Sequence, residues 1–313
     1  MIKTITAYAP ATCANVAVGF DILGFACDFI GDEVTLTLRE DKQILIEKID
    51  SAEILPFDIT KNTAAVVIKE MVEKLQLNMG FTLHIKKGIP LSSGLGGSAA
   101  SAVAAAVACN GFLKKPLTNE ELLPYILCGE AVASGEAHAD NIAPCLYGGL
   151  TLITSLHPLN IISLPIPEIF CVFVHPHLKI NTKEARSLLT PTILLKDHIK
   201  QTQQLAGFLV ALYQNNKKLL RYSLTDFVIE PQRAQLVPHF QKLKTIALEK
   251  GALGMSLSGS GPTLFAWTEK EEVADLIGLT FSQQFQREKI KAEYWVSKIT
   301  NEGAKIVKIN ESE

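Results

Sequence analysis

The chain has 313 residues, of which 48% are hydrophobic and 20% charged, and its formal net charge at pH 7 is −2. A chain of this length is expected to form about two globular domains, and it lacks the clustered basic excess typical of proteins that bind nucleic acid or membrane surfaces. The six cysteines stand far apart without a C-x-x-C pair, which indicates reduced thiols and a cytoplasmic location.

Short strands are predicted along the first half of the chain. The N-terminal residues MIKTITAYAP alternate as in a strand and contain no apolar core with a cleavage site, so we expect no signal peptide. Residues 81–85 (FTLHI) alternate with period 2, which favours a half-buried antiparallel strand. The strands expected in this half are residues 3–9, 33–39, 44–49, 80–85, 150–155 and 160–164.

Three helices are predicted between these strands. Asn62 is a suitable N-cap for a helix with apolar positions 66, 67, 71 and 75. A second helix is expected from Ser98 to about residue 113, too short to span a bilayer. A third begins at the Thr-x-x-Glu capping box of Thr118 and Glu121 and ends before Gly135.

Two prolines, Pro165 and Pro167, mark the expected boundary between a domain of residues 1–165 and one of residues 166–313. Strands and helices alternate in the second part, which favours an α+β sandwich of the split βαβ type. Strands are expected at residues 169–175, 253–258, 263–268 and 292–298, and helices at 183–190, 198–215, 217–228, 236–250 and 271–285.

The segment PLSSGLGGSAAS is predicted to bind phosphate. Gly94, Gly96 and Gly97 permit positive φ and remove side-chain bulk, so several backbone N–H groups can point at one anion beside the N-terminus of the next helix. The alternative is a tight turn between strand and helix, in which the glycines only permit the turn conformation and bind no ligand. No Gly-Lys-Ser/Thr or G-x-G-x-x-G follows, and the flanking strands look antiparallel, which excludes Walker A and Rossmann loops. The loop comprises Pro90, Leu91, Ser92, Ser93, Gly94, Leu95, Gly96, Gly97, Ser98, Ala99, Ala100 and Ser101.

This loop resembles the second motif of the GHMP kinases, the superfamily of galactokinase, homoserine, mevalonate and phosphomevalonate kinases. Residues 10–21 (PATCANVAVGFD) and 256–266 (SLSGSGPTLFA) resemble the first and third motifs in their homoserine kinase form, and residues 129–150 and 229–240 are also similar to that form. The departures are Cys13 and Ala17-Val18, where Ser and Gly-Pro are commoner, and Gly97, which is often Ser.

The resemblance implies an α+β fold of two domains, the first like ribosomal protein S5 domain 2 and the second ferredoxin-like. It implies ATP as the phosphoryl donor and a third motif packed against the phosphate loop. It also implies that Ser98 and Glu130 hold the Mg²⁺ that bridges the β- and γ-phosphates. A lone helical glutamate is usually solvated, but apolar neighbours surround Glu130, and a buried carboxylate needs a cation.

By the same resemblance, His138, Asp140 and Asn141 face the substrate. Mevalonate-kinase-like relatives have a carboxylate base at the position of Asn141, and an amide cannot accept a proton. Either Asp140 takes the proton, or no base is needed, because a loose phosphoryl-transfer transition state requires little activation of the nucleophile. We favour Asn141 as the residue that orients the hydroxyl and Asp140 as a ligand of the substrate ammonium.

An amino-acid substrate needs a guanidinium for its carboxylate and a carboxylate for its ammonium. Arg186, four residues after Thr182, and Arg233 match carboxylate-binding positions of homoserine kinases, although spacing alone is equally consistent with surface arginines. Asn15 and Asp21 match further substrate positions. Asn62 is either an N-cap only or also an adenine-side residue.

The resemblance thus implies phosphorylation of L-homoserine on the route to threonine, with a homodimer left open. There are two alternatives to this activity: a GHMP kinase for mevalonate or shikimate, and a non-catalytic sensor of this fold. Mevalonate and shikimate lack an α-ammonium. A non-catalytic sensor is expected to have a damaged phosphate loop, whereas Ser98, Glu130 and the three loop glycines are all present.

Overall fold

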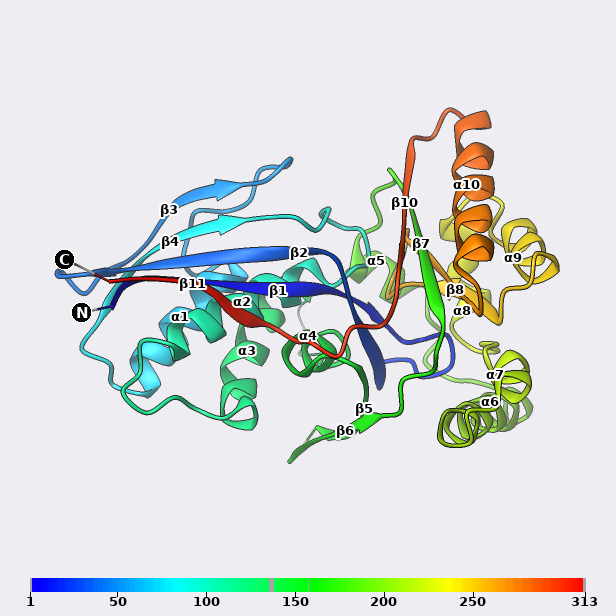
Figure 1. Cartoon of the computed structure of the whole chain (residues 1–313), viewed down its shortest axis with the longest axis horizontal. Helices are drawn as coiled ribbons and strands as arrows, with labels where there is room; N and C mark the ends of the chain where they lie inside the picture. Colours follow the sequence, from blue (N-terminus) through cyan, green and yellow to red (C-terminus); the bar gives the residue numbers. More distant parts are fainter. Residues whose placement is uncertain (1, 135–137, 157, 312–313) are drawn as a thin grey trace.

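The computed structural model describes residues 2–134, 138–156 and 158–311 of the chain. Its strands form two sheets, with helices against each (Figure 1). The first sheet has the order β11-β1-β2-β4-β3, and β5 continues it by pairing with β2 and β6. Its strands are β1 Ile2–Ala14, β2 Leu23–Arg39, β3 Ile44–Asp50, β4 Gly80–Lys86, β5 Leu150–Leu156, β6 Leu159–Leu164 and β11 Lys305–Glu311.

Helix α2 is the centre of the first core. It is rich in alanine, and its small side chains let it pack against the sheet and three neighbouring helices while staying buried along most of its length. The helices of this part are α1 Thr63–Lys74, α2 Gly97–Asn110, α3 Asn119–Ser134 and α4 Ile142–Tyr147. Both chain ends lie at the same end of the first sheet (Figure 1).

The second sheet is antiparallel, with the order β10-β7-β9-β8. Apolar side chains of α9 and α10, such as Leu243, Phe281 and Phe285, pack against it in a second core. Its strands are β7 Phe170–Pro176, β8 Gly254–Leu257, β9 Leu264–Thr268 and β10 Ala292–Ser297. The helices are α5 Thr182–Ser187, α6 Leu195–Tyr213, α7 Lys217–Ser223, α8 Glu230–Arg233, α9 Phe240–Glu249 and α10 Glu271–Arg287.

A cluster of aromatic rings joins the two parts. Phe25 of β2 lies 6.0 Å from Phe173 and 5.4 Å from Trp267, measured between ring centroids. These rings are fully buried. Aromatic pairs at such distances bury large apolar areas, so they fix β2 against the second sheet.

The predicted α+β class and the split βαβ order of the second sheet are confirmed. The local caps are also confirmed. Asn62 Oδ1 accepts from the N–H groups of Ala64 and Ala65, and Thr118 and Glu121 form the reciprocal capping box. Helix α3 ends at Ser134, and Gly135, named as the residue after it, lies outside the described residues.

Several predicted elements differ from the structure. The strands near the phosphate loop are not all antiparallel, because β4 is antiparallel to β2 but parallel to β3. Helix α4 and strand β11 were not predicted, since α4 has only six residues and β11 is an exposed strand that depends on pairing with β1. The helix expected at 217–228 ends at Ser223, because Asp226 instead accepts backbone hydrogen bonds that start α8.

The division at residues 165 and 166 remains a prediction, as does the likeness of the first part to ribosomal protein S5 domain 2. The predicted boundary falls in the connection between β6, which ends at Leu164, and β7, which begins at Phe170. Strand β11 comes from the other end of the chain and joins the first sheet. No helix among the described residues is long and apolar enough to cross a bilayer.

Candidate active site

A cavity of about 410 Å³ lies between the phosphate loop and elements of the second part. Nearly all the residues singled out in the sequence line it. The exceptions are Leu95 and Ala100, which are buried beneath the loop. The predicted residues that line it are Asn15, Asp21, Asn62, Pro90, Leu91, Ser92, Ser93, Gly94, Gly96, Gly97, Ser98, Ala99, Ser101, Glu130, His138, Asp140, Asn141, Thr182, Arg186 and Arg233.

The loop adopts the conformation for which its glycines are suited. Gly94 and Gly96 have φ values of +79° and +70°, and α2 begins at the next residue, Gly97. A Cβ atom on Gly96 would lie 2.0 Å from the Thr12 hydroxyl, so only glycine fits here. The first residues of α2, Gly97, Ser98 and Ala99, line the cavity, and the N–H groups at a helix N-terminus are suited to bind phosphate.

The third motif packs against this loop, as expected. Ser258 Oγ donates a 2.7 Å hydrogen bond to the carbonyl of Gly94, and the Thr263 N–H donates to the carbonyl of Ser93 at 3.2 Å. The first motif is tied to the same place, because Asn15 Nδ2 donates to the Gly259 carbonyl at 3.0 Å. Three segments far apart in sequence therefore meet at the cavity.

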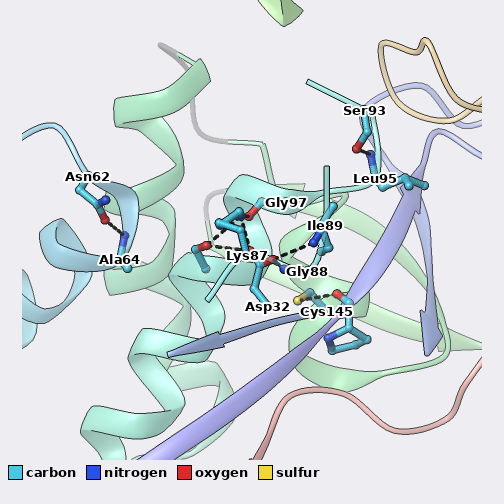
Figure 2. Close-up of polar contacts among 12 residues, drawn as sticks. Asp32, Asn62, Ala64, Lys87, Gly88, Ile89, Ser93, Leu95, Gly97 and Cys145 are labelled. Atoms are coloured by element: carbon cyan, nitrogen blue, oxygen red, sulfur yellow. Dashed lines mark hydrogen bonds and ion pairs between the residues drawn. The ribbon is translucent and has the colours of Figure 1, made fainter. Parts of the chain in front are cut away.

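A buried ion pair supports the loop from below (Figure 2). Lys87 Nζ contacts the Asp32 carboxylate and donates to the carbonyl of Gly97 at 2.6 Å and to Ser101 Oγ at 3.0 Å. Asp32 is fully buried and also accepts from the N–H groups of Gly88 and Ile89, each at 3.1 Å. This cluster connects the segment before the loop with the first turn of α2 after it.

Glu130 and Ser98 line the cavity beside the loop. Burial raises the pKa of Glu130 to about 7, the hydroxyl of Ser98 opposes the rise, and the carboxylate of Asp140 adds to it. A carboxylate and a hydroxyl are oxygen ligands that suit Mg²⁺, which normally keeps waters and substrate phosphates as its other ligands. The donor set therefore fits a divalent cation.

Asp140 and Asn141 lie where α4 begins, and Asp140 is buried. Burial, together with the nearby Asp21 carboxylate, raises the pKa of Asp140 to about 7. Asn141 Oδ1 accepts a 2.8 Å hydrogen bond from Thr12 Oγ1. Thr12, a residue of the first motif that the sequence did not single out, thus fixes the amide beside Asp140.

Further charged groups line the cavity close to Asp140. Arg186 contacts Asp21 through two N–H groups, with Nη2 2.7 Å from Oδ2 and Nη1 3.3 Å from Oδ1. The guanidinium groups of Arg186 and Arg233 both lie over the ring of Phe20, with their Cζ atoms 5.3 Å and 5.1 Å from its centroid. His138 Nδ1 is 4.0 Å from Asp21 Oδ1.

Arg233 and Thr182 come from the second part of the chain. Arg233 is almost fully buried and donates to the carbonyls of Ala185 and Gly259, both at 3.3 Å. Thr182 begins α5, and its hydroxyl lies 3.4 Å from that of Ser260. Asn62 also lines the cavity, and its Nδ2 donates to the carbonyl of Pro56 at 3.1 Å.

Known proteins resemble this chain over its whole length. Sequence models of the GHMP kinases N terminal domain and the GHMP kinases C terminal region match residues 62–149 and 208–287. A homoserine kinase of Chlorobium phaeobacteroides (strain BS1) is 40% identical over 320 residues, covering 98% of this chain and 100% of the relative. The chain belongs to the homoserine kinase family. A relative in the same family from Xylella fastidiosa (strain M12) is 41% identical, covering 96% of this chain and 93% of the relative.

Solved structures agree with this family. The crystal structure of homoserine kinase from Cytophaga hutchinsonii superposes with a TM-score of 0.95 at 41% identity, covering 98% of both chains. A mevalonate kinase of Methanococcus jannaschii matches with a TM-score of 0.69 at 16% identity, covering 95% of this chain and 98% of that one, and shares the fold alone. The two-domain GHMP kinase fold is therefore confirmed.

The sequence did not reveal four residues that build the site: Thr12, Phe20, Asp32 and Lys87. Lys87 stands three residues before the predicted loop, and a lysine at such a place is a usable signal for a phosphate site. Asp32 carries no such signal, because only the pairing of β2 with β4 brings it under the loop.

Proposed function

We propose that this chain transfers the γ-phosphoryl group of ATP to the side-chain hydroxyl of L-homoserine, in the cytoplasm and on the route to threonine. The observation that carries the proposal is one cavity lined both by the phosphate loop and by paired charges suited to a zwitterion, Asp21 and Arg186. Family membership at 40% identity over the full length supports the same reaction.

The phosphate loop binds the nucleotide through backbone N–H groups. Gly94 and Gly96 hold the loop in its left-handed conformation, and the N-terminus of α2 favours negative charge at its first turn. Ser92, Ser93 and Ser98 add hydroxyl donors. Asn62, as the N-cap of α1, holds the adenine-side wall of the cavity in place.

Ser98 and Glu130 are the residues proposed to hold Mg²⁺. The cation, when bound, neutralises charge that develops on the transferred phosphoryl group. Burial already disfavours the ionised form of Glu130, so a cation beside it restores the carboxylate at neutral pH.

Asn141 and Asp140 position the acceptor. Asn141, held by Thr12, orients the hydroxyl toward the phosphate, and Asp140 binds the substrate ammonium, assisted by Asn15, Asp21 and His138. Little proton abstraction is needed before the transition state, because phosphoryl transfer is loose and depends mainly on positioning and charge.

The remaining charges bind the α-carboxylate. Arg186 and Arg233 both contact Phe20, and Thr182 adds a hydroxyl from the start of α5. The guanidinium group presents parallel N–H donors that match a carboxylate. Residues of both parts of the chain therefore contribute to one acceptor site.

A coupled assay of ADP release tests the proposal. Purified protein is supplied with ATP and Mg²⁺ and with L-homoserine, mevalonate, shikimate or no acceptor. Turnover with homoserine alone is the expected result. Turnover with mevalonate or shikimate instead of homoserine contradicts the proposal. The absence of turnover with any of the three alcohols also contradicts it.

A further inference from the structure

The groups proposed to recognise the two charges of the substrate are already bonded to each other. Asp21 and Arg186 form a two-point ion pair although they are 165 residues apart in sequence. Each charge is about 30% exposed, with side-chain exposures of 28% for Asp21 and 34% for Arg186. A ligand that approaches either group must therefore disturb a pair that exists before it binds.

We propose that the Asp21–Arg186 pair selects zwitterions by charge exchange. The substrate carboxylate replaces Asp21 on Arg186, and the substrate ammonium replaces Arg186 beside Asp21, so a ligand with only one charge leaves one member of the pair uncompensated. This inference rests on the proposed function, since it assigns how the same site discriminates among hydroxyl-bearing ligands.

The surroundings hold both members in place during such an exchange. The backbone N–H of Asp21, whose φ is +62°, donates to Asn15 Oδ1 at 3.0 Å. The guanidinium of Arg186 lies over Phe20, which also contacts Arg233. Asp21, Arg186 and Asp140 line the same cavity, so one ligand in it can contact all three.

The charges that face the pair favour this exchange. His138 approaches Asp21 from the loop before α4, and Arg233 lies over the same Phe20 ring as Arg186. Asp140 lies near enough to Asp21 for the two carboxylates to disfavour each other's ionisation. An ammonium placed between them relieves that repulsion, and the carboxylate of the same ligand offsets the charge of Arg186.

A simpler alternative makes a different prediction. If Asp21 and Arg186 acted independently, removing the charge of Asp21 would weaken binding of ligands with an ammonium and leave carboxylate-only ligands unchanged. Charge exchange predicts instead that a carboxylate-only ligand gains affinity, because it no longer has to break the pair. A gain of binding on removal of a binding residue is thus the distinguishing result.

The test uses Asp21→Asn and calorimetric binding in the presence of a non-hydrolysable ATP analogue and Mg²⁺. Asparagine tolerates positive φ and keeps the backbone N–H that bonds to Asn15, so the local fold is retained. The ligands are L-homoserine, 4-hydroxybutyrate, which lacks the ammonium, and 2-amino-1,4-butanediol, which lacks the carboxylate.

For Asp21→Asn we expect Kd for 4-hydroxybutyrate to fall about tenfold and Kd for homoserine to rise about tenfold or more. The reciprocal variant Arg186→Gln is expected to bind 2-amino-1,4-butanediol more tightly than the unchanged protein does. An unchanged or higher Kd for 4-hydroxybutyrate in Asp21→Asn, with the melting temperature preserved, overturns the inference.

A matched control is available on the surface. Asp41 forms a comparable two-point pair with Arg39, and neither residue lines the cavity. Asp41→Asn is expected to leave all three Kd values unchanged. If the unchanged protein binds and phosphorylates homoserine but Asp21→Asn does not bind 4-hydroxybutyrate more tightly, the charge-exchange inference is wrong and the proposed function stands. If homoserine is not a substrate at all, the proposed function is wrong.

Discussion

The hydroxyl of Thr12 donates a 2.8 Å hydrogen bond to Oδ1 of Asn141, across 129 residues of sequence. Thr12 is buried, and its backbone N–H also donates to the carbonyl of Leu95 in the phosphate loop at 3.1 Å. One residue therefore sets the position of the loop and the orientation of the amide proposed to hold the acceptor hydroxyl. Because Oδ1 accepts this bond, we expect the NH₂ group of Asn141 to be the part that donates to the acceptor.

Replacing Thr12 by valine is expected to lower kcat about tenfold, because the isosteric side chain keeps the packing but loses the bond that orients Asn141. KM for ATP should change little, and Thr12→Ser should restore activity. In an Asn141→Ala background, Thr12→Val should have almost no further effect on kcat. Independent, additive losses in this double-mutant cycle would contradict the positioning role.

Removing the charge of Asp32 should both destabilise the protein and weaken ATP binding. Asp32→Asn leaves Lys87 buried without its counter-charge, which is expected to lower the free energy of unfolding by about 3 kcal/mol, as measured by urea denaturation. KM for ATP should rise because the segment before the loop loses its attachment to α2.

The neighbouring pair of Lys86 and Glu33 is a natural control for that experiment. It joins β2 to the last residue of β4, directly beside Asp32 and Lys87, with a separation of 3.0 Å, but is exposed. Lys86→Met is therefore expected to change the free energy of unfolding by less than about 1 kcal/mol. Equal effects at the two pairs would show that burial of Asp32 is not what matters.

Gly94→Ala should disrupt the contact between the phosphate loop and the third motif. A Cβ atom on Gly94 would lie 2.4 Å from the carbonyl oxygen of Ser258 and 2.8 Å from that of Gly261, and backbone cannot yield as a side chain can. Gly149 has a similar φ of +73°, yet its nearest neighbour would be 3.7 Å away. Gly149→Ala should lower the free energy of unfolding by about 1 kcal/mol, because of the backbone conformation alone.

Measured melting temperatures separate the steric effect of an added Cβ atom from the effect of the positive φ at these two glycines. The Gly94 variant should lose clearly more stability than the Gly149 variant and should lose most of its activity at saturating homoserine. Comparable losses of stability and activity in both variants would mean that the close approach at Gly94 is unimportant.

The contribution of Asp140 to the stability of the ligand-free protein should fall as pH rises from about 4 to 7. The pKa of Asp140 is raised to about 7, so in this range the folded state binds more protons than the unfolded state, and the unfavourable ionisation of a buried carboxylate appears as pH increases. Asp140→Asn should flatten this dependence and raise the melting temperature at pH 8 by about 2–4 °C.

The same variant tests the role of Asp140 in the reaction. If Asp140 binds the ammonium, Asp140→Asn should raise KM for homoserine while kcat stays near normal. A collapse of kcat with KM unchanged would instead identify Asp140 as the general base.

The sequence alone was sufficient for features that depend on neighbours in the chain. The glycine loop, the N-cap at Asn62 and the capping box of Thr118 and Glu121 are each determined by a few consecutive residues, because turn conformation and helix ends are local. The family motifs likewise predicted most of the residues singled out as lining the cavity, including Glu130.

Only the tertiary structure determined which of these residues act together. Thr12 meets Asn141, Asp32 meets Lys87 and Asp21 meets Arg186 through the pairing of strands and the packing of the two sheets. Such contacts join segments whose own composition says nothing about the partner, because burial and charge compensation depend on the surroundings supplied by the whole fold.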